Sequence, residues 1–275
     1  MTTHQRPAAG LAAGSNTPLP PPGSGRPLRA SEPGKNRRDV PLTRRYDVSV
    51  RTPHGEIDSF TRVAPATAMF EDAFAAFARG TLIATAQGPV AVEDLAPGMT
   101  IQTVSAGPQP LLWVGSMTVY PERRDGGPGG ERGGEGGSLT RLAADAFGYG
   151  RPAPDLVLGP RARLLYRSAG CRDLVGADEV VAPAHAFIDG VGAIQLRPMT
   201  PVRVYHLALH GQHILRANGM EVESYHPGPS PELMMTPDTL ELFLSLFPHV
   251  EGPQAFGPMS VPRLTAFELD RVRAA

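Results

Sequence analysis

Three histidines that lie close together in the sequence, His206, His210 and His213, have the residue type and spacing that could support chemistry. An imidazole can exchange a proton near neutral pH, and it is a common ligand of zinc. A zinc site would need further ligands, but no cysteine and no well-spaced acid completes a tetrahedral set here. Alternation along a strand would place His206 and His210 on one face, with His213 beyond Gly211. We therefore predict no metal, no cofactor and a structural role for these rings.

The other chemically active side chains give no clearer site. The single cysteine, Cys171, excludes an internal disulfide and lies in a segment predicted to form a turn, so we interpret it as a structural thiol. Glu93, Asp94 and Glu223 are interpreted as solvated or turn-capping acids rather than a catalytic pair. The strands and helices around these residues must position them, and the sequence pattern predicts those elements more clearly than it predicts a site.

Short apolar or β-branched runs, bounded by Gly, Pro or Asp, predict an all-β fold between residues 80 and 226. The predicted strands are 82–85, 90–92, 100–104, 111–114, 156–158, 164–166, 180–181 and 194–196. The first two form a hairpin that closes at Gly88, where glycine can adopt a positive φ.

The two ends of the chain differ from this β pattern. Residues 1–64 are interpreted as a Pro- and Arg-rich disordered arm and linker; the first 45 hold eight Lys or Arg and two acids, a formal charge of +6 (8 minus 2). Residues 122–138 contain eight Gly and are predicted to be a mobile insertion within a domain spanning 65–228. Residues 229–275 are predicted to be a helical extension, because Thr236-Pro237-Asp238 has the features of a helix start and an apolar stripe follows. A second amphipathic stretch carries Leu264, Phe267 and Val272.

Composition and hydropathy limit the cellular location and the partners that we expect for the chain. No run approaches the roughly 20 apolar residues of a membrane span, and no signal-peptide core is recognisable. A cytoplasmic location is therefore expected, with non-classical export left open. We interpret the basic arm as a solvated linker and not as a nucleic-acid-binding segment. A protein partner is expected, but its identity and the oligomeric state do not follow from the sequence.

Two ordered motifs at the ends of the β region point to a family. Ala76–Gly88 reads AFARGTLIATAQG, and Val204–Val222 reads VYHLALHGQHILRANGMEV. The first resembles the family opening C-F-A-x-G-T, and the second resembles V-Y-D-L-x-V-x-x-x-H-x-F-x-A-N-G-I-x-V. With the segments at 89–99 and 110–115, these motifs resemble the Hint domain of inteins and hedgehog proteins. The resemblance implies a Hint-type horseshoe of short curved strands.

The resemblance also implies a site, since Hint domains process their own peptide bonds. The nucleophilic Cys aligns with Ala76, and the general-acid His of a T-x-x-H motif aligns with Ala162 in Gly159–Ala162. The terminal His-Asn of inteins aligns with Glu223-Ser224. His213 matches the His of the second family motif. Loss of the nucleophile, the acid and the Asn favours a catalytically degenerate binding or scaffold module. Two alternatives stay open: self-cleavage by a different nucleophile such as Thr81, and a structural component of an assembly.

Overall fold

Two antiparallel sheets account for most of the ordered chain. The computed structural model describes residues 42–52, 54–104, 106–121, 137–229 and 235–274. Residues 1–41 of the arm and linker predicted over 1–64, and residues 122–136 of the insertion predicted over 122–138, lie outside these residues. Pro41–Ala275 forms one compact unit. Within the described residues, no helix is long and apolar enough to cross a membrane.

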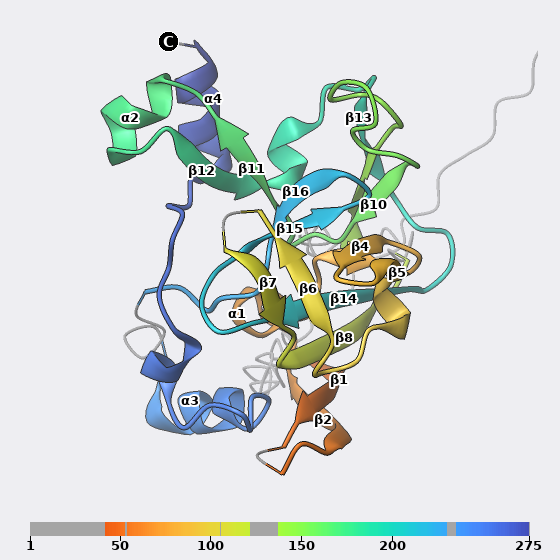
Figure 1. The fold of residues 1–275 in the computed structure, drawn as a ribbon, viewed down its shortest axis with the longest axis vertical. Coiled ribbons are helices and arrows are strands. Elements are labelled where there is room, and N and C mark those ends of the chain that lie inside the picture. The colour runs from red at the N-terminus through yellow and green to blue at the C-terminus, as the bar shows by residue number, and fades with distance from the viewer. Residues whose placement is uncertain (1–41, 53, 105, 122–136, 230–234, 275) are drawn as a thin grey trace, which may run out of the picture. The chain divides into compact units, whose positions relative to one another are not determined.

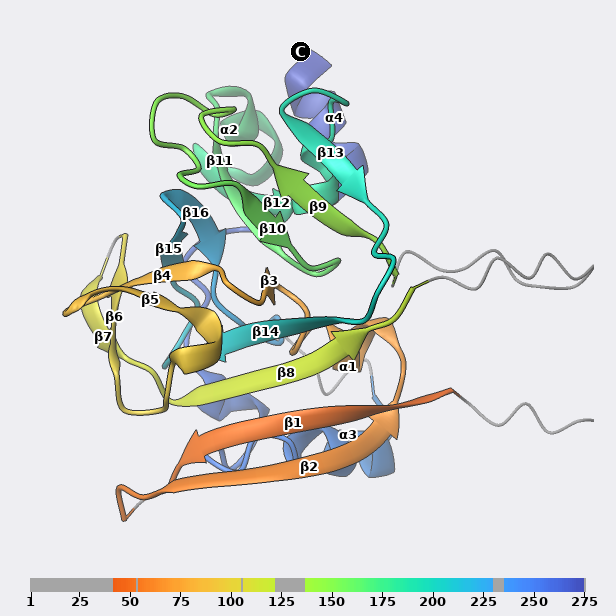
Figure 2. The same cartoon turned by 90° about the vertical axis from the view of Figure 1, so that its right-hand side faces the viewer.

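The first sheet has eight strands, and its spatial order does not follow the chain (Figure 1). In that order they are β13 (Ala193–Leu196), β9 (Leu139–Leu142), β10 (Leu156–Leu158), β3 (Phe77–Ala78), β14 (Val202–Ala208), β8 (Trp113–Val119), β1 (Thr43–Arg51) and β2 (Ile57–Pro65). Figure 2 shows β14, β8, β1 and β2 side by side, with β2 at the outer edge.

The second sheet also has eight strands. They are β12 (Glu179–Pro183), β11 (Arg163–Arg167), β16 (Met220–Glu223), β15 (Ile214–Ala217), β4 (Leu82–Thr85), β6 (Thr100–Thr103) and β7 (Gly107–Pro110), with β5 (Gly88–Ala91) paired to β4. Gly88 has the predicted positive φ, of 110°, in the β4–β5 turn. The all-β prediction is therefore confirmed, with strand ends shifted by a few residues: the second strand of the predicted hairpin ends at Ala91, and the strand with Trp113 continues to Val119.

Helical segments are short, and the two longest of those in the described residues lie near the C-terminus. They are α1 (Ala68–Glu71), α2 (Gly170–Val175), α3 (Pro237–Leu244) and α4 (Ala266–Ala274), with 3₁₀ turns η1 (Val92–Asp94), η3 (Ala184–Phe187) and η5 (Pro253–Phe256). Thr236 caps α3 by accepting a hydrogen bond from the Thr239 amide. The predicted helical extension is thus present, and the Trp113 indole packs against it, donating to the Leu246 carbonyl at 2.8 Å and stacking on Phe247.

Three sequence-based expectations about the helices and strands are wrong. Residues 43–65 are not a disordered linker but a β-hairpin, in which β1 pairs with both β2 and β8. Cys171 lies in α2 instead of a turn, although it is buried as expected of a structural thiol. Phe267 faces solvent with 70% of its surface exposed, and Leu269 is the buried residue beside Val272 on α4.

The hairpin joins the apolar core and does not merely flank it. Tyr46, Val48 and Val50 alternate along β1 and are buried with Phe74 and Trp113. The Tyr46 and Phe74 ring centroids are 4.5 Å apart. Residues on both sides of position 76 therefore contribute to the same packed structure.

Candidate functional site

The peptide bond between Ala75 and Ala76 lies where the resemblance places the scissile bond, and it is held on two sides. The Ala76 amide donates to the Tyr205 carbonyl of β14 at 3.0 Å. The Ala75 carbonyl accepts from the Arg161 amide at 3.0 Å, and the Ala76 carbonyl accepts from the Gly159 amide at 2.8 Å. Both alanines are fully buried. The structure thus brings Ala76 against the segment between β10 and β11.

Gly159 makes this contact a close one. A Cβ atom added at Gly159 would lie 2.2 Å from the Ala75 carbonyl oxygen and 2.7 Å from its carbon. These are backbone atoms, so they cannot move aside as the end of a flexible side chain could. Only glycine fits against this peptide in the present arrangement.

Ala162 completes the segment and is also buried. Its amide donates to the Gly159 carbonyl at 3.3 Å, and its own carbonyl accepts from the Ala184 amide at 2.8 Å. Ala76 and Ala162 belong to one apolar cluster, together with Phe77 and Leu158. Two of the four predicted site positions are therefore brought together, and both carry a methyl group.

His213 and Ser224, the other two predicted positions, are hydrogen-bonded to each other. The His213 amide donates to the Ser224 hydroxyl at 2.9 Å, and the Ser224 amide donates to the His213 carbonyl at 2.8 Å. The His213 ring contacts the His210 carbonyl through Nε2 at 3.1 Å. Neither side chain bonds to the Ala75–Ala76 segment among the residues that the structure describes.

His206 is a buried ring close to the Ala75–Ala76 segment. Its Nδ1 donates to the Asp72 carbonyl at 2.8 Å, and the ring meets Phe77 and Tyr225 edge-on. Its Nε2 has no hydrogen-bond partner among the described residues. Burial lowers the pKa of His206 to about 4, in spite of the Asp72 carbonyl and the Glu223 charge, which act to raise it. The ring is therefore neutral near pH 7.

Ion pairs surround the segment that leads to Ala76. Asp72 lies 3.4 Å from the Arg161 Nε and 3.3 Å from the Arg163 Nη2. Glu71, which is 4% exposed, pairs with Arg44 at 2.8 Å and with Arg161 at 3.7 Å. These ion pairs hold Glu71 and Asp72 to β1, to β11 and to the loop that precedes β11.

Glu223 extends the ion pairs from the other side. It is 1% exposed, so its interpretation as a solvated or turn-capping acid is wrong. Its carboxylate lies 3.5 Å from the Arg163 Nη1 and 2.9 Å from the Arg263 Nε, and it also accepts from Gln212. Sequence reasoning missed this network because its members are distant in the chain, as Asp72 and Arg163 are 91 residues apart.

Thr81 and Cys171, the remaining candidates, are both buried. The Thr81 hydroxyl donates to the Ala78 carbonyl at 2.7 Å. Burial raises the pKa of the Cys171 thiol, as does the Asp178 charge, and this opposes formation of a reactive thiolate. No group of three or more His, Cys, Asp or Glu in the described part of the chain could hold a metal ion.

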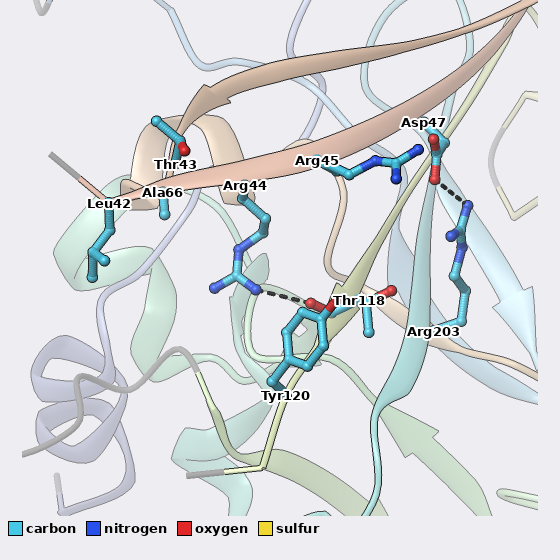
Figure 3. Close-up of a pocket in the computed structure, with 9 residues that line it drawn as sticks. All are labelled: Leu42, Thr43, Arg44, Arg45, Asp47, Ala66, Thr118, Tyr120 and Arg203. Carbon is cyan, nitrogen blue, oxygen red and sulfur yellow. Dashed lines mark hydrogen bonds and ion pairs between the residues drawn. The ribbon is translucent and has the colours of Figure 1, made fainter. Parts of the chain in front are cut away.

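A surface cavity of about 540 Å³ lies beside β1 (Figure 3). Its lining includes Arg44, Arg45 and Arg203, but no residue from 72–76 or 159–163. Arg203 pairs with Asp47 at 2.5 Å, and Arg44 donates to the Thr118 carbonyl at 2.8 Å, as Figure 3 shows. Two of the three arginines that line the cavity, Arg44 and Arg203, are therefore engaged in contacts within the protein.

Comparison with known proteins identifies the family of the chain. The family model described as Hint domain matches residues 75–229, which begin at the buried peptide bond described above. The chain belongs to the Hint domain family.

The other comparisons add little to this assignment. No curated protein matches the chain. A solved bacterial intein-like domain from Clostridium thermocellum is similar over 55% of this chain and 99% of its own, with 14% identity and a TM-score of 0.37.

Proposed function

We propose that this protein is a catalytically silent Hint domain that serves as a binding or scaffold module. The observation that carries the proposal is Ala76 itself. It is fully buried, it carries no nucleophilic atom, and the carbonyl before it is held by the Arg161 amide and pressed against Gly159. The chain around this bond is packed as a structural core.

The chemistry of self-processing supports this interpretation. Attack on a resonance-stabilised amide requires a thiolate or an alkoxide, and a methyl group supplies neither. A general acid contributes on the order of 10²- to 10⁴-fold to such a reaction, and the aligned position holds Ala162. Ser224 replaces the Asn that would cyclise in an intein. His213 is bonded to a neighbouring loop carbonyl and has no nucleophile to serve.

Self-cleavage by Thr81 is the less favoured alternative. Its side chain is 3% exposed and its hydroxyl donates to the Ala78 carbonyl three residues earlier. To attack the peptide bond that precedes it, as the family's nucleophile does, Thr81 would have to give up that hydrogen bond. A buried Thr that is already hydrogen-bonded is better explained as a structural residue.

A gain-of-function experiment tests whether position 76 is the lost nucleophile. The double variant Ala76→Cys, Ala162→His should cleave slowly before residue 76 when a thiol is added, because the Arg161 amide already donates to the Ala75 carbonyl. Gly159 is left unchanged, since it has no room for a side chain. Mass spectrometry of the reduced, denatured protein should detect a fragment that begins at residue 76. The wild type and both single variants should yield less.

Ala78→Cys, Ala162→His is the matched control, because Ala78 is also buried and lies in β3, two residues after Ala76. Equal cleavage in this control, or reaction through Cys171, would show that the nucleophile position is not 76. Circular dichroism of each variant would establish that the substitutions leave the fold intact.

A further inference from the structure

The last strand of the first sheet is β2, nine residues long, and its outer edge has no partner strand in the described part of the chain. Among the described residues it pairs only with β1, and Figure 2 shows it as the last strand of its sheet. An edge strand offers a row of N–H and C=O groups to any further strand, and short strands, bulges or inward-facing charges commonly block such pairing. Strand β2 is long, and its register with β1 is unbroken over its whole length.

The register identifies which backbone groups are free. The pairs flanking the hairpin ladder, Thr52 with Glu56 and Ala66 with Leu42, are hydrogen-bonded at 2.8 and 2.7 Å. Bonded and non-bonded pairs alternate along an antiparallel ladder. The even-numbered residues of β2 therefore bond to β1. The odd-numbered residues direct their amides and carbonyls outward, and these are Ile57, Ser59, Thr61 and Val63.

The exposed side chains of residues 57–63 are arranged symmetrically about Phe60. Ile57 and Val63 lie three residues to either side and are 52% and 60% exposed. Asp58 and Arg62 lie two residues to either side, and both are exposed with opposite charge. The strand is thus complementary to its own sequence in the reverse direction.

We propose that β2 pairs with β2 of a second copy of this chain, antiparallel and centred on Phe60. Ile57 then lies opposite Val63 of the partner subunit, and Ser59 lies opposite Thr61 of the partner subunit. Every one of these residues has its free backbone groups on the outer edge, so the pairs are hydrogen-bonded. The two first sheets become one continuous sheet across a two-fold axis, which is the closed symmetry of a stable homodimer.

Side chains select this register over its neighbours. It places Asp58 opposite Arg62 of the partner subunit, twice by symmetry, and Phe60 opposite its own equivalent. Opposite charges and aromatic pairs across strands are stabilising, whereas like charges are destabilising. A shift of two residues in either direction still pairs odd-numbered residues with one another, but it loses both ion pairs and places Asp58 or Arg62 opposite Phe60. The inference concerns a surface distinct from the Ala75–Ala76 site and does not depend on catalytic silence.

Charge reversal on the full chain tests the proposal. Light scattering between about 1 µM and about 500 µM should give the wild type twice its 29.2 kDa chain mass at the upper end. Asp58→Arg and Arg62→Asp each place like charges opposite one another, so each should raise the dimer dissociation constant by about tenfold or more. A mixture of the two variants should form a heterodimer, since each then supplies the charge that the other needs. The double variant should again self-associate.

Asp270→Arg, on the exposed surface of α4, is the control for charge reversal away from β2 and should associate like the wild type. A wild type that stays monomeric throughout this range overturns the proposal, whether β2 is covered by residues 1–41 or left bare. A dimer that survives both single reversals overturns it as well, because its interface then lies elsewhere. Failure of the two single variants to pair with each other would exclude the proposed register.

Discussion

Replacing Gly159 with alanine should lower the free energy of unfolding by about 3 kcal/mol, at the upper end of the effects of overpacking a core. The added Cβ would lie 2.2 Å from the Ala75 carbonyl oxygen, far inside a van der Waals contact. To relieve the clash, the segment must move away and lengthen the hydrogen bonds from the Gly159 and Arg161 amides. Urea denaturation followed by tryptophan fluorescence measures this difference.

Gly252→Ala provides the matched control. No atom lies within 4 Å of a Cβ added there, and its φ of −176° suits any residue. It should change the unfolding free energy by no more than about 0.5 kcal/mol. If Gly159→Ala were as mild as this control, the close packing of 159–161 against the Ala75–Ala76 bond would be wrong. Gly159→Thr, which restores the residue type of the family, should destabilise at least as much as alanine.

Acid should destabilise the protein through His206. Its pKa is about 4 in the folded state and 6.5 for the ordinary side chain, and burial is the main cause. Between these values the unfolded chain binds the proton that the folded ring refuses, so stability falls as the pH drops from about 6.5 to about 4. With each pKa unit worth about 1.4 kcal/mol, His206 accounts for a loss of about 3 kcal/mol over this window.

Comparison with His206→Phe isolates that contribution. Phenylalanine retains an aromatic ring beside Phe77 and Tyr225 but cannot take up a proton. We expect it to be less stable than the wild type at pH 7, because the hydrogen bond to the Asp72 carbonyl is lost, and to lose less stability on acidification. His249, whose pKa burial also lowers to about 4, remains in both proteins and cancels in the comparison. Parallel stability curves for the two proteins between pH 6.5 and 4 would contradict the prediction.

Local sequence signals predicted the elements that depend on local chemistry. The β4–β5 hairpin follows from an apolar run closed by Gly88, and α3 follows from the Thr236 cap and its apolar stripe. The hairpin over 43–65 was missed because Pro and Arg dominate the surrounding composition. Its alternation of Tyr46, Val48 and Val50 is short, and its second strand exposes most of both faces.

The packing around the candidate site required the structure. Family resemblance located Ala76 and Gly159–Ala162, but no local pattern indicates that Glu223 would be buried between two arginines from distant segments. On α4, residues three apart share a helical face and residues five apart do not. Leu269 and Val272 are therefore buried together while Phe267 faces solvent, contrary to the predicted stripe.

The intact mass of the wild-type chain tests catalytic silence most directly. It must be measured after denaturation, because residues 43–75 share a core with Trp113 and a fragment cut before residue 76 would stay bound without a covalent link. After prolonged incubation with a thiol or hydroxylamine, we expect a single species at the full 29.2 kDa, since no ester or thioester exists to be intercepted. A fragment that begins at or near residue 76 would contradict the account.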